Sequence, residues 1–204
     1  MKNLLRYSLF IFVMCIACIL CNAQNLKGGI TLGMNASQVD GDFSGGFNQI
    51  GIRAGGFVGY KISENFSLQG QLLFEQLGSA GGNQGGRIIR TNYFSFPLLA
   101  VVDLPILLGE KEYIIQFQVG PAVGVLLDSK DFFGEFVDLN SPDLRGLAGF
   151  AFALGKNSLT VHYGYSLTSL AGQAQGNPIL TSNARGLFHN YVSFGLNFVL
   201  FSPE

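Results

Sequence analysis

Eight stretches of this chain alternate apolar side chains with small or polar ones, and this pattern constrains the fold more than any other feature. Successive side chains of a β-strand point to opposite faces, so a period of two predicts strands. Each stretch has at least the roughly 9 to 11 residues that a tilted strand needs to cross a membrane. The expected strands are residues 26–39, 48–61, 66–78, 87–104, 112–127, 144–154, 159–170 and 186–201.

The two faces of the expected strands differ in the manner of a membrane barrel. In the last strand Phe194, Leu196 and Phe198 share one face, whereas Ser193 and Asn197 share the other. An apolar outside with a polar inside is the reverse of a soluble barrel and is typical of a transmembrane one. Because closure satisfies every backbone group in lipid, we predict an all-β, eight-stranded antiparallel up-and-down transmembrane β-barrel.

The connections between the expected strands alternate in length. The long ones are residues 40–47, 79–86, 128–143 and 171–185, and the short ones are 62–65, 105–111 and 155–158. Outer-membrane barrels have short periplasmic turns and longer extracellular loops, and an N-terminus on the periplasmic side gives this order. Within the fourth stretch Pro97 removes one ladder hydrogen bond and suggests a bulge.

Residues 1–23 have the three parts of a secretory signal peptide. Lys2 and Arg6 precede an apolar run, and small residues up to Ala23 form a cleavage site. The run is shorter than the roughly 20 residues of a membrane-spanning helix, so a retained anchor is the less favoured alternative. We expect a cleaved signal peptide over residues 1–23, a barrel domain over residues 24–204, and location in the cell outer membrane.

Composition excludes several other classes of protein. Charged residues make up 12% of the chain, against about 25% in typical soluble domains. The net charge of −1 gives no basic footprint for nucleic acid. All three cysteines lie in the leader, so the mature chain has no disulfide and no cysteine metal site. Two histidines leave little for zinc or heme, and we expect neither a metal nor a cofactor.

Arg53 and Glu75 form the sharpest pair of charges in the predicted interior. Both have inward parity on neighbouring strands joined by a tight turn, and if Lys61 faces Ser67, Arg53 faces Glu75. An unpaired charge inside a narrow barrel is costly, whereas a hydrogen-bonded pair can fill it. We therefore predict a salt bridge in the lumen, with an ion-conducting role as the alternative.

His189 and Ser166 are the best candidates for catalysis. The last two strands form a hairpin that places Ser166 or Thr168 beside His189, all with inward parity. Small outer-membrane barrels include lipid A deacylases and acyltransferases, in which an imidazole takes the serine proton. No carboxylate on either strand is placed to orient the imidazole. We expect that the protein is not an enzyme, with a lipid-modifying enzyme as the alternative.

The long connection over residues 128–143 combines carboxylates with phenylalanines. Phe132, Phe133 and Phe136 form a candidate contact patch, because an exposed aromatic cluster favours binding. The carboxylates could hold a hard cation, but their spacing matches no EF-hand loop, and a solvated acidic loop is the expectation. These carboxylates are Asp128, Asp131, Glu135, Asp138 and Asp143.

Several segments resemble the PorT-like outer-membrane barrels of Bacteroidetes. Residues 93–99, YFSFPLL, are similar to the Tyr-x-Glu-Ile-Pro-Leu-Leu segment of that family, with Ser95 in place of its Glu. Residues 119–121, 143–149, 162–167 and 192–201 are similar to later segments. The resemblance implies an eight-stranded, Sec-exported outer-membrane protein without catalytic residues. The founding type is linked to type IX secretion of proteases and surface proteins.

The expected function is that of a small outer-membrane barrel with a structural role or a partner-binding role through its long loops. Eight strands leave an interior that side chains fill, which disfavours a diffusion pore of the porin kind. A soluble periplasmic barrel that binds a hydrophobic ligand is a third alternative, and the apolar outward faces argue against it. The expected partners are outer-membrane lipid and lipopolysaccharide, the barrel assembly machinery, and a protein at the long loops.

Overall fold

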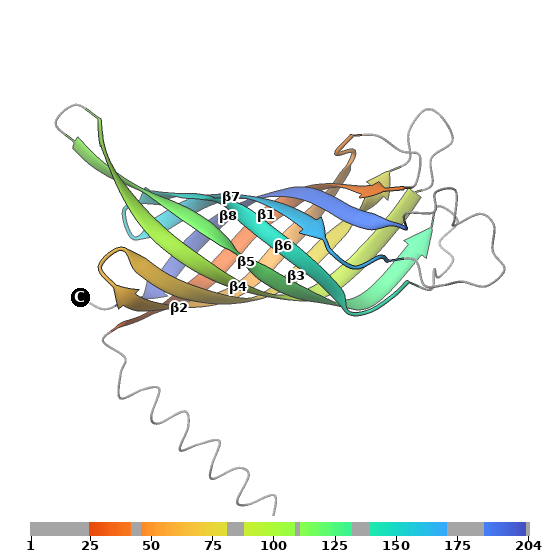
Figure 1. The fold of residues 1–204 in the computed structure, drawn as a ribbon, viewed down its shortest axis with the longest axis horizontal. Coiled ribbons are helices and arrows are strands. Elements are labelled where there is room, and N and C mark those ends of the chain that lie inside the picture. Colours follow the sequence, from red (N-terminus) through yellow and green to blue (C-terminus); the bar gives the residue numbers. More distant parts are fainter. Residues whose placement is uncertain are drawn as a thin grey trace, which may run out of the picture.

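The chain forms a closed barrel of eight antiparallel strands (Figure 1). The computed structural model describes residues 25–41, 46–80, 88–108, 111–131, 139–170 and 186–202. The predicted fold class is confirmed, whereas the expected signal peptide, residues 1–23, lies outside the described residues. No helix in the described part of the chain is long and apolar enough to cross a membrane. The strands are β1 (Leu26–Asp40), β2 (Gln49–Ser63), β3 (Phe66–Ala80), β4 (Ile88–Leu108), β5 (Lys111–Asp131), β6 (Asp143–Leu154), β7 (Asn157–Ser166) and β8 (Phe188–Phe201).

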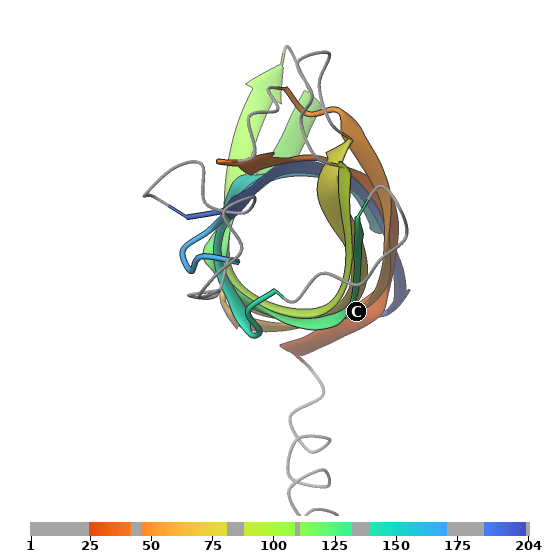
Figure 2. The ribbon, with the colours of Figure 1, turned by 90° about the vertical axis from the view of Figure 1, so that its right-hand side faces the viewer.

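Each strand pairs with its neighbours in sequence, and β1 pairs with β8 to close the ring, which Figure 2 shows along the barrel axis. Closure gives every strand a neighbour on each side, so that none is an edge strand. We call the end with the β2–β3, β4–β5 and β6–β7 connections the turn end, and the opposite end the loop end. All eight strands run between these two ends.

Side chains divide between the two faces as the alternation predicts. On β8, Phe194 and Leu196 are exposed on the outer surface, whereas Ser193 and Asn197 are buried in the lumen. On β3, Leu72 is exposed and Glu75 is buried. The outer surface is therefore apolar, whereas the buried polar side chains lie in the interior beside small apolar clusters, which suits a barrel surrounded by lipid.

The β4–β5 hairpin is longer than the sequence indicates. Residues 105–111 were expected to be a turn, but Pro105 pairs with Ile114 and Leu107 with Glu112. Pairing of β4 with β3 ends at Val102 and that of β5 with β6 ends at Ile115, so this ribbon projects beyond its neighbours at the turn end (Figure 1). Cross-strand pairing of apolar and β-branched residues favours strand over turn here.

Two further expectations about strand geometry are wrong. The ladders on both sides of Pro97 keep one register, so there is no bulge at that proline. The bulge lies instead between Asn92 and Tyr93, where β5 contributes Leu127 as an extra residue. Strand β7 ends at Ser166 rather than at residue 170, since Leu144 N donates to the Thr168 hydroxyl (2.9 Å) instead of to a backbone partner.

Candidate functional site

Arg53 and Glu75 face each other in the lumen in the register that the tight β2–β3 turn sets. Arg53 Nε lies 3.5 Å from Glu75 Oε1, and both side chains are buried. The guanidinium also donates to Gln71 Oε1 (2.8 Å) and to Ser193 Oγ on β8 (2.9 Å). This pair is therefore one part of a network that reaches across the barrel.

Arg145 on β6 is the second cation of this network. Its Nε donates to Asp143 Oδ2 (2.6 Å), and its Nη1 donates to Glu75 Oε2 (3.2 Å) and Ser95 Oγ (3.1 Å). Its guanidinium carbon stacks over the Tyr93 ring, 4.2 Å from the centroid, a favourable cation–π arrangement. Two arginines and two carboxylates thus balance in the interior, which is the condition under which buried charges are tolerated.

Sequence reasoning missed the role of Arg145. Arg145 and Asp143 share inward parity on β6, opposite to Leu144, and this was the available signal. Their partners could not be assigned, because a long connection of unknown register precedes β6. The structure also corrects the expected acidic loop, since Asp143 is buried in the lumen and Asp128 lies within β5.

His162 joins the network from β7. Its Nε2 lies 2.7 Å from Gln118 Oε1, and its Nδ1 lies 3.4 Å from Arg53 Nη1. A guanidinium can only donate and the Gln118 oxygen can only accept. These partners assign a neutral imidazole that carries its proton on Nε2. His162 therefore connects Arg53 to the far wall of the lumen without adding a charge.

His189 and Ser166 are neighbours, but they do not form a base and nucleophile pair. The Ser166 hydroxyl accepts from the backbone N–H of His189 (3.2 Å) and donates to Asp143 Oδ2 (3.0 Å). The His189 ring points elsewhere, with Nε2 3.3 Å from both Tyr93 OH and Thr91 Oγ1. Ser166 is 0% exposed, so its hydroxyl is not open to solvent in this arrangement.

Glycines make room for the large polar side chains of the interior. A Cβ on Gly124 would lie 2.6 Å from Arg145 Nη2, and one on Gly164 would collide with the Tyr191 ring. Real Cβ atoms do not approach neighbours so closely, because interiors are close-packed. The lumen is therefore filled by Arg145, Tyr191 and their partners rather than open.

The contact patch and a cation site are the remaining candidates from the sequence. Phe132, Phe133 and Phe136, the candidate contact patch, lie outside the described residues. Within the described ranges no group of three or more His, Cys, Asp or Glu side chains could hold a metal ion.

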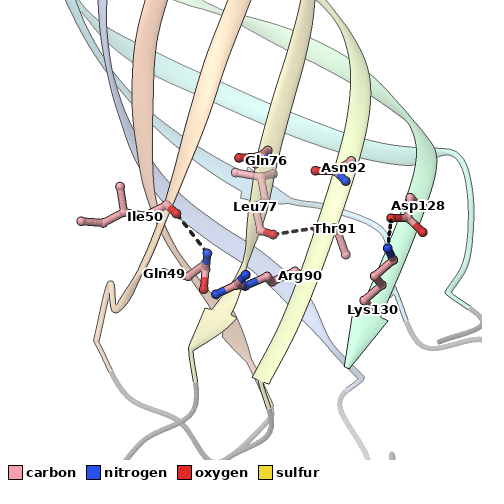
Figure 3. Close-up of a pocket in the computed structure, with 9 residues that line it drawn as sticks. All are labelled: Gln49, Ile50, Gln76, Leu77, Arg90, Thr91, Asn92, Asp128 and Lys130. Carbon is pink, nitrogen blue, oxygen red and sulfur yellow. Dashed lines mark hydrogen bonds and ion pairs between the residues drawn. The ribbon is translucent and has the colours of Figure 1, made fainter. Parts of the chain in front are cut away.

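A second candidate site is a hollow of about 340 Å³ near the loop end (Figure 3). Its wall consists of residues from the loop ends of β2, β3, β4 and β5. Most of these residues are polar, although the hollow lies at the edge of an apolar surface. They are Gln49, Ile50, Gln76, Leu77, Arg90, Thr91, Asn92, Asp128 and Lys130.

The hollow lies where β2 and β3 stop pairing. Their ladder runs only as far as Arg53 and Glu75, and beyond it the Ile52 N–H donates to the side-chain oxygen of Gln76 (3.3 Å). From β1, Asn35 Nδ2 donates to Gln76 O (3.3 Å). This close approach needs Gly51, because a Cβ there would collide with Gln76 O. Side chains thus replace the backbone ladder at this seam.

The chain is similar to known outer-membrane proteins. Residues 22–172 match the family described as outer membrane protein beta-barrel domain, whereas no curated protein matches the chain. Among solved structures, Ail, the attachment invasion locus protein of Yersinia pestis, has 14% sequence identity and a TM-score of 0.45, over 86% of this chain and 99% of that chain. Neisserial surface protein A (NspA) has 11% identity and a TM-score of 0.42, over 83% and 95%. A de novo designed transmembrane β-barrel has 9% identity and a TM-score of 0.39, over 85% and 95%. Since the family match extends over most of the sequence, the chain belongs to the outer membrane protein beta-barrel domain family, whose place is the outer membrane.

Proposed function

We propose that this protein is a non-enzymatic binding protein of the outer membrane. In this proposal the barrel is a sealed anchor, and the surface that contacts a protein partner lies on the long loops. The observation that supports it best is the ion network that joins Arg53, Glu75, Arg145 and Asp143 across the lumen. Because side chains fill the lumen, a partner would bind the outside of the barrel or its loops.

The buried network argues against conduction. Arg145 is 0% exposed and reaches from β6 to Glu75 on β3. Charges held in ion pairs and hydrogen bonds fill the interior instead of lining a water path, in keeping with the small inner volume of eight strands. The salt bridge between Arg53 and Glu75 therefore supports the structural interpretation over the ion-conducting one.

The geometry also favours a binding role over lipid modification. Acyl transfer by a serine needs an adjacent base that takes its proton. The proton of Ser166 points to Asp143, and the His189 ring faces Tyr93 and Thr91. Both side chains are buried, so an acyl chain outside the barrel has no route to them.

For the contact surface we propose the aromatic cluster of Phe132, Phe133 and Phe136 in the connection between β5 and β6. Sequence alone supports this assignment, because exposed aromatic clusters mark binding surfaces. The more specific form of the proposal is a role beside a secretion apparatus, as in the PorT-like barrels of Bacteroidetes, and it is supported by the motif resemblance over residues 93–99.

Cross-linking in native cells tests the proposal. The three phenylalanines are replaced together by serine, and Phe47→Ser provides the control, because Phe47 is an exposed aromatic at a different long connection. We expect a discrete cross-linked complex with the native chain and Phe47→Ser, and its loss in the triple variant. A complex that persists in the triple variant would contradict the assignment to this loop, and identification of its components tests the link to secretion.

A further inference from the structure

Two cations stand opposite each other on the outer surface of the barrel at the loop end. Arg90 on β4 pairs in register with Lys130 on β5, and Asn92 pairs with Asp128 in the next row. Arg90 and Lys130 are exposed. Like charges directly opposite each other on antiparallel strands destabilise a sheet. This arrangement therefore favours an anion that lies between them.

The bulge at Leu127 puts Lys130 on this outer face. Outward side chains on β5 have odd numbers up to Val125, and strict alternation would turn residues 128 and 130 into the lumen. With one extra residue in β5, Ser129 is buried instead and Lys130 faces outward. Bulges commonly re-aim side chains in this way. The bulge thus places Lys130 on the same outer face as Arg90.

Amide groups complete the hollow beside the two cations. Figure 3 shows Gln49 next to Arg90, with Gln76 and Asn92 on the same wall. The Gln76 oxygen accepts from Ile52 N–H, which leaves the Gln76 amide nitrogen as a donor. An anion in the hollow would meet guanidinium, ammonium and amide donors together. That donor set suits phosphate oxygens.

One carboxylate shares the hollow. Asp128 Oδ2 lies 3.7 Å from Lys130 Nζ, and no carboxylate of another described residue forms an ion pair with Arg90. Asp128 therefore competes with a bound anion for Lys130.

The position of the hollow along the barrel axis indicates where the anion comes from. Directly toward the turn end, the outer surfaces of β4 and β5 are apolar and exposed at Phe94, Phe96 and Val125. The cations lie just beyond this apolar band, at the level where lipid head groups begin. A ligand with a phosphate at that level and acyl chains alongside the apolar band would contact both surfaces at once.

We propose that this hollow binds the phosphorylated head group of an outer-leaflet glycolipid, of which diphosphoryl lipid A is the representative. Arg90 and Lys130 hold the phosphate between them, and the amides of Gln76 and Asn92 donate to its remaining oxygens. The acyl chains lie along Phe94 and its apolar neighbours. This assignment needs the outer-membrane location of the barrel and is independent of the proposed protein partner.

Native mass spectrometry of the purified full-length barrel in detergent tests this assignment. Diphosphoryl lipid A and its dephosphorylated counterpart are titrated separately, and the fraction of barrel with bound lipid gives the apparent Kd. We expect the dephosphorylated lipid to bind at least about tenfold more weakly, the value of one charge-assisted contact. Equal binding of the two lipids would overturn the proposal, because acyl chains alone would then explain retention.

Variants locate the site. Arg90→Gln and Lys130→Gln should each weaken binding of diphosphoryl lipid A about tenfold, whereas Lys156→Gln, an exposed lysine at the turn end, should leave it unchanged. Asp128→Asn should tighten binding, and an impaired fold cannot produce such a gain. Unchanged binding in all of these variants would place the lipid elsewhere. Displacement of lipid A by an equal concentration of inorganic phosphate would overturn the assignment to a lipid, because a free anion would then be the preferred ligand.

Discussion

Arg145 on β6 and Glu75 on β3 meet inside the barrel, with Nη1 3.2 Å from Oε2, although two strands separate them in the wall. Glu75 also faces Arg53 on β2. One carboxylate thus lies between two guanidinium groups contributed by opposite sides of the ring. This contact links strands that are not neighbours in the wall, and it stabilises the barrel in addition to the hydrogen-bonded ladders.

Replacement of Glu75 by glutamine should destabilise the barrel strongly. The change leaves two buried arginines with only Asp143 as a counter-charge, and loss of one partner from a buried ion pair costs about 3–5 kcal/mol. Urea unfolding in detergent, followed by the gel mobility of the folded barrel, measures the effect. Glu64→Gln, at the exposed β2–β3 turn, is the control and should unfold like the native chain. Equal stability of the two variants would show that the network does not stabilise the barrel.

Replacement of Gly124 by alanine should also destabilise the barrel. The added Cβ would lie 2.6 Å from Arg145 Nη2 and 3.2 Å from a Tyr93 ring carbon, and overpacking of this kind costs about 1–3 kcal/mol. The same substitution at Gly70, where a Cβ meets nothing within 4 Å, should be neutral. Thermal unfolding of both variants makes the comparison. If Gly70→Ala were the more damaging, the glycines would serve the backbone rather than the lumen.

Removal of the Ser166 hydroxyl should affect stability and leave lipid A unaltered. Ser166→Ala deprives Asp143 of a donor at 3.0 Å and the His189 N–H of its acceptor at 3.2 Å, and each unsatisfied buried group costs about 1–3 kcal/mol. Mass spectrometry of lipid A from cells with the native chain, with Ser166→Ala and without the gene should give identical spectra. Acyl loss that depends on Ser166 would revive the enzymatic alternative.

The projecting β4–β5 ribbon should be dispensable for the stability of the barrel. Beyond Asp103, whose N–H donates to Asn65 O, and beyond Ile115, its residues pair only with each other within the described chain. Leu104 and Ile115 face each other, so an Asn-Gly turn between them can replace residues 105–114. The shortened barrel should unfold at the temperature of the native chain. It should also self-associate less on detergent dilution, because Leu107, 75% exposed, is removed. A lower unfolding temperature would reveal contacts of the ribbon that the wall pairing does not show.

The sequence contained enough information to predict the strands, their inner and outer faces, and the Arg53–Glu75 register. The alternation fixes each face because the period is two, and the tight β2–β3 turn fixes the register. Arg145 could not be matched with Glu75 in the same way. Their contact crosses the lumen between strands that do not pair, and periodicity gives the face of a side chain without its direction across the interior.

The loop-end hollow was hidden from sequence reasoning for a different reason. Alternation assigns Lys130 to the wrong face unless the bulge at Leu127 is known, and a bulge becomes visible only in the pairing of β4 with β5. The early end of the β2–β3 ladder has no signal of its own, because Gly51 follows the ordinary inward parity of its strand and Gln76 the ordinary outward parity. Irregular pairing between strands is therefore the information that the pattern lacks.

The bond from Arg53 to Ser193 has a consequence for how this protein reaches its native state. It joins β2 to β8, 140 residues apart, and so exists only once the first and last strands have met. Until that moment the guanidinium of Arg53 lacks one of its acceptors, and a water molecule must accept the hydrogen bond that Ser193 accepts in the closed barrel. Closure of the wall therefore completes the hydrogen bonding of a guanidinium whose charge Glu75 already balances from the adjacent strand.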